Sequence, residues 1–206
     1  MKRFSLSSVA AVVAASLVAA AAASGQSNIP RPFAIGVYGG GSMPIGDFKN
    51  RADIGYHAGV FGSTALSGPL SVRLDGAYSK FNKEIAFGDT VITALTKVFH
   101  TTLDVEYSLG TQTEMAAGGG ALPYISGGAG FYRFRYDDSC AGPGSACSAF
   151  VVSSGSETRW GLNAGAGASF FLSGFTPFVD IRYHTTSPKA GGFRFNMVLA
   201  SFGLKF

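Results

Sequence analysis

Residues 99–109, Phe-His-Thr-Thr-Leu-Asp-Val-Glu-Tyr-Ser-Leu, alternate between two kinds of side chain along the whole stretch. The odd-numbered positions carry apolar groups and one threonine, whereas the even-numbered positions are polar and include His100, Asp104 and Glu106. Successive side chains of a β-strand point to opposite faces, so a period of two predicts a strand. Because the two faces differ in polarity, we expect this strand to lie between an apolar and a polar environment.

The same alternation recurs through the rest of the chain. It is clear at residues 70–79, 98–109, 160–172, 178–184 and 198–206, and weaker at residues 33–41, 55–66 and 124–136. These segments predict eight strands, and several are longer than the ~9–11 residues that a tilted transmembrane strand needs.

The predicted connections alternate in length, which is typical of outer-membrane barrels with short turns on one side and long loops on the other. The short and moderate connections cover residues 67–69, 110–121 and 173–176, and the longer ones cover residues 42–54, 82–96 and 137–157. A short connection at residues 186–192 lies on the long-loop side and is the exception to this alternation.

The first 23 residues have the pattern of a secretory signal peptide. Lys2 and Arg3 precede an apolar run from Val9 to about Ala23, which ends in small residues. At roughly 15 residues the run is shorter than the ~20 that a retained membrane anchor helix needs. We therefore expect a cleavable signal peptide at residues 1–23, with Gly25 as the alternative cleavage point, and one domain at residues 24–206.

The composition excludes some classes of function. Charged residues make up 14% of the chain, against about 25% in an ordinary soluble domain. The formal charge of +4 falls to 14 − 12 = +2 without Lys2 and Arg3, and no basic cluster indicates a nucleic-acid partner. Beyond the signal peptide, no stretch of 18 consecutive apolar residues occurs. A transmembrane β-barrel explains an apolar chain of this kind, because it distributes apolar residues over alternate strand positions.

Period two alone does not decide which face points outward, since a soluble lipocalin-type barrel also has eight strands. The polar face here is mostly Gly, Ser, Asn and Thr with isolated charges, rather than the Lys- and Glu-rich coat of a soluble barrel. Aromatic residues gather near predicted strand ends, as interfacial girdles do. The sequence therefore favours an all-β fold, an eight-stranded antiparallel transmembrane β-barrel, over the soluble alternative.

Three stretches resemble a known family, the outer-membrane β-barrel domain family that contains OmpA-like, OmpX-like and opacity-type porin-family proteins. They are residues 36–48 with 55–62, residues 123–134, and the terminal strand that ends at Phe206. The resemblance implies a Gram-negative-type outer membrane, with lipid and lipopolysaccharide around the barrel and the barrel-insertion machinery as an assembly partner. The terminal residues that match the family's insertion signal are Val198, Phe202, Leu204 and Phe206.

The polar face is expected to form an ion-pair network that packs the lumen, because a buried charge without a partner is very costly. The expected members are Arg73, Asp75, His100, Asp104, Glu106, Arg133, Arg135, Asp180, Arg182 and His184, together with Lys205. The alternative is a polar path for a small solute, although eight strands leave an interior that side chains can fill.

Cys140 and Cys147 lie in a turn-rich segment and predict a disulfide, because the protein is exported. No histidine flanks them and their spacing is not C-x-x-C, which argues against a metal or redox site.

The sequence indicates a structural or surface-interaction role, with an unknown extracellular ligand contacted by the long loops. The alternatives are a narrow porin-like channel and, less favoured, an enzyme that modifies lipid A. His184 is followed by Thr185, Thr186 and Ser187, but no G-x-S-x-G or H-E-x-x-H motif occurs. We predict no catalytic, cofactor or metal site.

Overall fold

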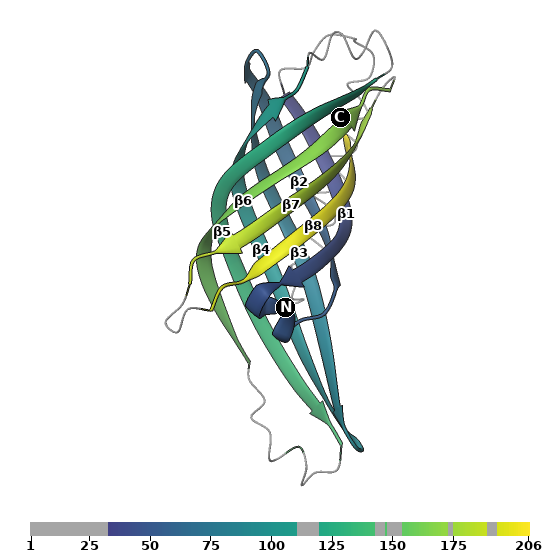
Figure 1. The fold of residues 1–206 in the computed structure, drawn as a ribbon, viewed down its shortest axis with the longest axis vertical. Coiled ribbons are helices and arrows are strands. Elements are labelled where there is room, and N and C mark those ends of the chain that lie inside the picture. Colours follow the sequence, from purple (N-terminus) through teal and green to yellow (C-terminus); the bar gives the residue numbers. More distant parts are fainter. Residues whose placement is uncertain (1–32, 111–119, 143–146, 148–153, 173–174, 189–192) are drawn as a thin grey trace, which may run out of the picture.

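The computed structural model describes residues 33–110, 120–142, 147, 154–172, 175–188 and 193–206. In this part of the chain, eight antiparallel strands form a closed barrel, in which each strand pairs with its sequence neighbours and the last pairs with the first (Figure 1). The strands are β1 (Phe33–Ile45), β2 (Gly55–Ser67), β3 (Leu70–Phe87), β4 (Thr90–Ser108), β5 (Ala121–Ala141), β6 (Ser154–Phe170), β7 (Thr176–Thr186) and β8 (Asn196–Lys205), and a 3-10 helix, η1 (Gly46–Asn50), follows β1.

The predicted eight-stranded all-β architecture is confirmed. The predicted signal peptide, residues 1–23, lies outside the described residues. Among those residues, no helix has the length and apolar character that crossing a membrane requires.

The outer surface of the barrel is apolar and its interior is polar in the middle. Along β4, His100, Asp104 and Glu106 are buried, whereas Leu103 and Val105 are about half-exposed. The alternation continues on the other strands, so that leucine, isoleucine and aromatic side chains cover the outside. An outer surface of this kind is stable against lipid rather than water.

The strands differ in length, and this gives the barrel one tall side. β3 to β6 have 17–21 residues, whereas β7 and β8 have 11 and 10. The pairing of β2 with β3 ends at Tyr56 and Lys80, but β3 and β4 stay paired as far as Phe87 and Thr90. The extensions of β3 to β6 project at the lower end of Figure 1. We call them the projecting rim, residues 81–96 and 136–142 with 154–155.

One predicted loop is therefore largely strand, and a second begins and ends as strand. Residues 82–87 and 90–96 pair across a tight turn that contains Gly88, whose φ of +58° suits glycine. Likewise β5 continues through Ala141 before the predicted 137–157 connection leaves it. The alternation fails as a signal here because both faces of the ribbon around residues 82–86 are exposed or half-exposed.

The opposite end of the barrel carries the short connections. β2 and β3 are joined there by a turn with Gly68 at φ +55°. The carboxyl terminus also lies at this end, which is the upper end of Figure 1. The Phe206 amide donates to the Ile35 carbonyl at 2.8 Å and completes the pairing of β1 with the end of the chain.

Candidate functional site

The barrel interior contains three layers of side chains, whose order can be followed along β4. From the turn end toward the projecting rim, its inward side chains are first Glu106 and Asp104, then His100, and then Val98. Neighbouring strands add side chains of the same kind at each level. The result is an ion-pair layer, a histidine layer and an aromatic layer.

Arg182 on β7 is the centre of the ion-pair layer. Its guanidinium donates to Asp104 Oδ2 at 2.8 Å, to Asp180 Oδ2 at 3.0 Å and to Glu106 Oε1 at 3.3 Å. All four side chains are at most 6% exposed. One guanidinium thus joins carboxylates from two strands, β4 and β7, that are not neighbours in the barrel, and its planar set of donors suits this arrangement.

Arg73 on β3, which lies opposite Asp104, adds a second guanidinium to the layer. Its Nε donates to Asp75 Oδ2 at 2.9 Å, and its Nη1 donates to Glu106 Oε1 at 3.2 Å. Asp75 also accepts a hydrogen bond from the Tyr38 hydroxyl. The guanidinium carbon lies 3.6 Å from the centroid of the Phe61 ring, which adds a cation–π contact.

Lys205 Nζ lies 3.9 Å from Glu106 Oε2 and is the third cation of the layer. Three cations therefore face four carboxylates, and nearly all the charge is offset by direct contacts. A buried ion without such partners would cost several kcal/mol, on the order of the stability of a whole domain.

Glycines on the inward faces of β5 and β6 make room for this layer. A Cβ at Gly128 would overlap the Asp104 carboxylate, and one at Gly165 would lie 2.5 Å from Arg182 Cγ. The cavity that remains among Tyr38, Arg73 and their neighbours has a volume of about 10 Å³. This is about the space that one water molecule needs.

The histidine layer is held by hydrogen bonds to hydroxyl groups. His57 contacts Ser42 Oγ at 3.1 Å and Ser201 Oγ at 2.9 Å. His184 Nδ1 lies 2.8 Å from the Tyr132 hydroxyl, and its ring lies 5.0 Å from that of His100. These contacts join β1, β2, β4, β5, β7 and β8 across the lumen.

The hydroxyls that follow His184 in the sequence do not form a nucleophile–base pair with it. The neighbouring residue Thr185 lies on the other face of β7 and donates to Asn196 Oδ1 at 2.8 Å. Thr186 faces inward, but its hydroxyl accepts a hydrogen bond from the Phe195 amide. Among the described residues, no cluster of three or more His, Cys, Asp or Glu is placed to hold a metal ion.

The aromatic layer lies inside the barrel at the base of the projecting rim. Helix η1 places Phe48 inside the barrel, where its ring centroid lies 5.0 Å from those of Phe81 and Phe195. Phe195 also stacks on Phe134 at 4.0 Å and lies under the guanidinium of Arg159 at 4.6 Å. These phenylalanines, apart from Phe195 at 3%, have no exposed surface.

Arg159 joins this layer to the rim. It donates to Glu157 Oε1 at 3.0 Å and to the Phe193 carbonyl at 2.9 Å. Glu157 also accepts a hydrogen bond from the Tyr136 hydroxyl at 2.6 Å. The charged groups at this level, Arg159 and Glu157, thus lie on the rim side of the aromatic rings rather than among them.

The structure separates the ten predicted members of the lumen network into two groups. Eight lie inside and are buried: Arg73, Asp75, His100, Asp104, Glu106, Asp180, Arg182 and His184. The prediction for Arg133 and Arg135 is wrong, because both are exposed on the outer face.

The reason is the unbroken register between β4 and β5, which runs from Tyr124 to Ala141 without a bulge. Tyr124 faces inward, so Tyr132 and Phe134 must also face inward and the two arginines must face out. Counting in steps of two from the apolar outward position at Ile125 would have given the correct face.

The sequence analysis missed the aromatic layer and its cap, which are formed by Phe48, Phe81, Phe134, Phe195 and Arg159. The contact of Phe48 with Phe195 joins residues 147 positions apart and leaves no local signal. Of the predicted insertion-signal residues, Val198, Phe202 and Leu204 lie on the outward face of β8. Their recognition by insertion machinery stays a prediction.

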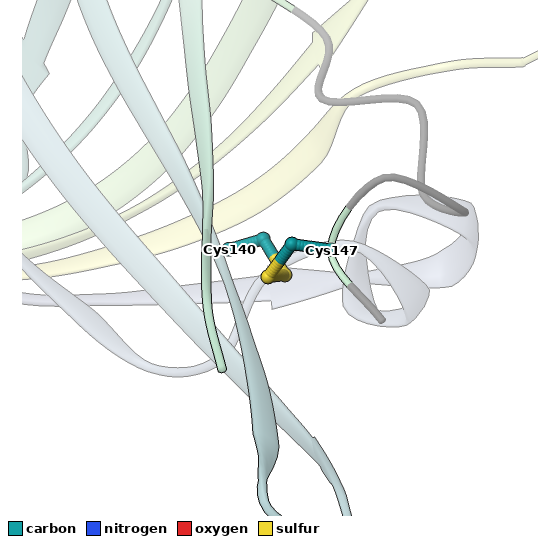
Figure 2. The surroundings of a disulfide bond; sticks show 2 residues. All are labelled: Cys140 and Cys147. Atoms are coloured by element: carbon teal, nitrogen blue, oxygen red, sulfur yellow. A yellow bond between two sulfur atoms is a disulfide. The ribbon is translucent and has the colours of Figure 1, made fainter. Parts of the chain in front are cut away.

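The two cysteines form a disulfide, shown in Figure 2. Cys140 lies at the end of β5, opposite Ile92 of β4 in the rim, and its Cα lies 5.8 Å from that of Cys147. The bond therefore ties the start of the β5–β6 connection to the paired part of the rim.

Comparison with known proteins bears on the whole fold. Residues 8–206 match the family model of the outer membrane protein β-barrel domain. No curated protein sequence matches the chain.

Several solved structures share its fold. The structure of Neisserial surface protein A is 13% identical, with a TM-score of 0.58, and the match covers 85% of this chain and 96% of that one. A major outer membrane protein from Thermus thermophilus is 12% identical, with a TM-score of 0.50 and coverage of 85% and 99%. The N-terminal barrel domain of Pseudomonas aeruginosa OprF is 17% identical, with a TM-score of 0.48 and coverage of 84% and 97%.

At these identities the structures from Neisseria and Thermus thermophilus show the fold alone, whereas the family match extends over nearly the entire sequence. It agrees with the closed eight-stranded barrel, the apolar outer surface and the charged interior. The chain therefore belongs to the outer membrane protein β-barrel domain family and is a protein of the bacterial outer membrane.

Proposed function

We propose that this protein is a closed outer-membrane barrel that acts at the cell surface through its projecting rim. The observation that carries the proposal is the difference in strand length, because β3 to β6 extend well beyond the ends of β7 and β8. In outer-membrane barrels the short turns face the periplasm and the longer connections face outward. The rim is then the part of the molecule that meets the outside.

The rim is well suited to binding because it is largely ordered before a ligand arrives. Residues 81–96 form a continuous hydrogen-bonded ribbon, and residues 136–141 of β5 pair with residues 91–96 of it. The Cys140–Cys147 disulfide restricts the connection that follows. A surface that is held in one shape loses less conformational entropy on binding than a free loop does.

A trimmed variant tests the surface role. An Asn-Gly turn would replace residues 84–93 between the paired Lys83 and Ala94, and a second would replace residues 138–153 between the paired Asp137 and Ser154. Both cysteines are removed, so no free thiol remains. We expect cells that express the trimmed barrel to lose adhesion to an immobilised sulfated polysaccharide or mucin-type glycoprotein that retains cells expressing the full chain.

The control for this experiment is equal surface expression, together with the change in gel mobility on boiling that a folded barrel shows. Equal adhesion of the two strains to both probes would overturn the surface role.

The filled lumen argues for a closed barrel rather than the narrow-channel alternative. Ion pairs, histidines and aromatic rings follow one another along the axis, and the cavity in the ion-pair layer has a volume of about 10 Å³. We expect the folded protein to insert into planar bilayers without discrete conductance steps. Reproducible steps of one size would instead favour the channel, and Arg182 would then be the first residue to replace.

A further inference from the structure

The outward apolar surface ends in an aromatic row on the side of the projecting rim. On each of β3 to β7, the last apolar outward position before the rim is aromatic: Tyr78, Phe99, Phe131, Trp160 and Tyr183. Aromatic rings of this kind lie at the boundary between hydrocarbon and headgroups. The outward residues that follow them are therefore at the level of the lipid headgroups.

On three adjacent strands these next residues are basic. Lys80 of β3 lies directly opposite Lys97 of β4, which in turn lies directly opposite Arg135 of β5. Arg133, one outward position closer to the membrane, lies opposite Phe99. We call these four residues, Lys80, Lys97, Arg133 and Arg135, the basic collar.

The collar carries an excess of positive charge. Lys97 Nζ lies 2.7 Å from Asp137 Oδ2, and within the described chain this is the only ion pair formed by the collar. Four cations thus have one carboxylate among them. Like charges directly opposite each other on neighbouring strands are destabilising, so an anion that lies over the row would stabilise it.

We propose that the basic collar binds the phosphate groups of an anionic glycolipid of the outer leaflet, an inference that rests on the outward orientation of the rim in the proposed function. The collar is at headgroup depth, and each basic residue at such a surface favours anionic lipid. Arginine is suited to phosphate because its guanidinium can donate two parallel hydrogen bonds to one group. Closer to the middle of the membrane than the collar, Leu74 and Leu103 lie opposite each other on the outer surface. The acyl chains of the same lipid would pack there.

A soluble polyanion fits this surface less well. Such a ligand would contact the charges but not the apolar band directly beneath them. The collar and the band are continuous along β3 and β4, because Lys80 and Tyr78, like Lys97 and Phe99, are successive outward positions. This continuity indicates a ligand with a charged headgroup and long apolar chains.

The test compares two variants that each remove three positive charges. K80Q/K97Q/R135Q changes the row of opposed residues, whereas the control K49Q/R51Q/R194Q changes exposed basic residues outside the collar and the rim. Native mass spectrometry of the detergent-solubilised full-length protein, with bisphosphorylated lipid A added, measures the bound lipid. We expect at least a tenfold weaker retention of lipid A for the collar variant and unchanged retention for the control variant.

Two further lipids decide which chemistry is recognised. Lipid A without its phosphates should bind the unaltered protein as weakly as phosphorylated lipid A binds the collar variant. Equal retention by the two variants, no effect of dephosphorylation, or equally strong binding of phosphatidylglycerol would each overturn the proposal. A gel-mobility change on boiling shows that both variants are folded.

Discussion

Replacing Arg182 by methionine is expected to lower the free energy of unfolding of the barrel by about 3–5 kcal/mol. The side chain is buried and donates to Asp104, Asp180 and Glu106. Methionine has a similar length but no charge, so these three carboxylates would keep only the cations Arg73 and Lys205 near them. The loss of stability arises mainly because buried carboxylates are left without a partner. The lost electrostatic attraction between Arg182 and these carboxylates is the smaller part.

Unfolding of the detergent-solubilised protein in urea would measure this effect. Trp160 is the only tryptophan and lies on the apolar outer surface, so its emission reports the loss of contact with the micelle. The matched control is Arg133→Met, which changes an exposed arginine and should shift the free energy of unfolding by no more than about 0.5 kcal/mol.

The pair also tests which arginines lie inside. If Arg133→Met were the more destabilising substitution, the inward face of β5 would be assigned incorrectly. Equal and small effects of both substitutions would mean that water reaches the carboxylates, and the lumen would then be open rather than filled.

The barrel itself could be predicted from the sequence because it depends on local alternation. In β4 every inward residue from His100 to Glu106 is polar, and the outward ones are mostly apolar, so the strand and its two faces are both visible. The disulfide could be predicted for a similar reason, since the cysteines are only seven residues apart.

Alternation fails where the environment of a face changes along one strand. On β5 the outward face is apolar at Ile125 and Phe131 but basic at Arg133 and Arg135, because the strand leaves the hydrocarbon between them. The inward face of β5 changes in the opposite sense, from polar side chains to the rings of the aromatic layer. A rule that assigns polar residues to the lumen therefore gives the wrong face for this part of the strand.

The aromatic layer could not be predicted because it depends on contacts between distant segments. Phe48 reaches Phe195 only because η1 turns into the barrel after β1 and because β8 closes against β1. Neither segment has a pattern that indicates burial. Only the closure of the barrel brings the segments of Phe48 and Phe195 together.

Phe195→Ala is expected to lower the free energy of unfolding by about 3–5 kcal/mol, the usual cost of removing a buried phenylalanine. Phe195 is 3% exposed, and its ring contacts those of Phe48, Phe134 and Phe193. The same urea titration measures the change. Arg194→Ala, which alters the exposed neighbour in the chain, is the control and should have little effect.

A double-mutant cycle and a smaller substitution at Phe195 test whether the loss of stability comes from packing of the rings. The stacked pair Phe134 and Phe195 should show a coupling energy of about 0.5–1.5 kcal/mol in a double-mutant cycle, because aromatic pairs contribute beyond the area they bury. Phe195→Leu should recover part of the loss, since a leucine fills more of the space than an alanine. If Phe195→Ala were nearly neutral, the rings could not form a packed layer. The barrel would then be closed by the ion pairs alone, and the conductance of this variant would be the measurement that shows whether they suffice.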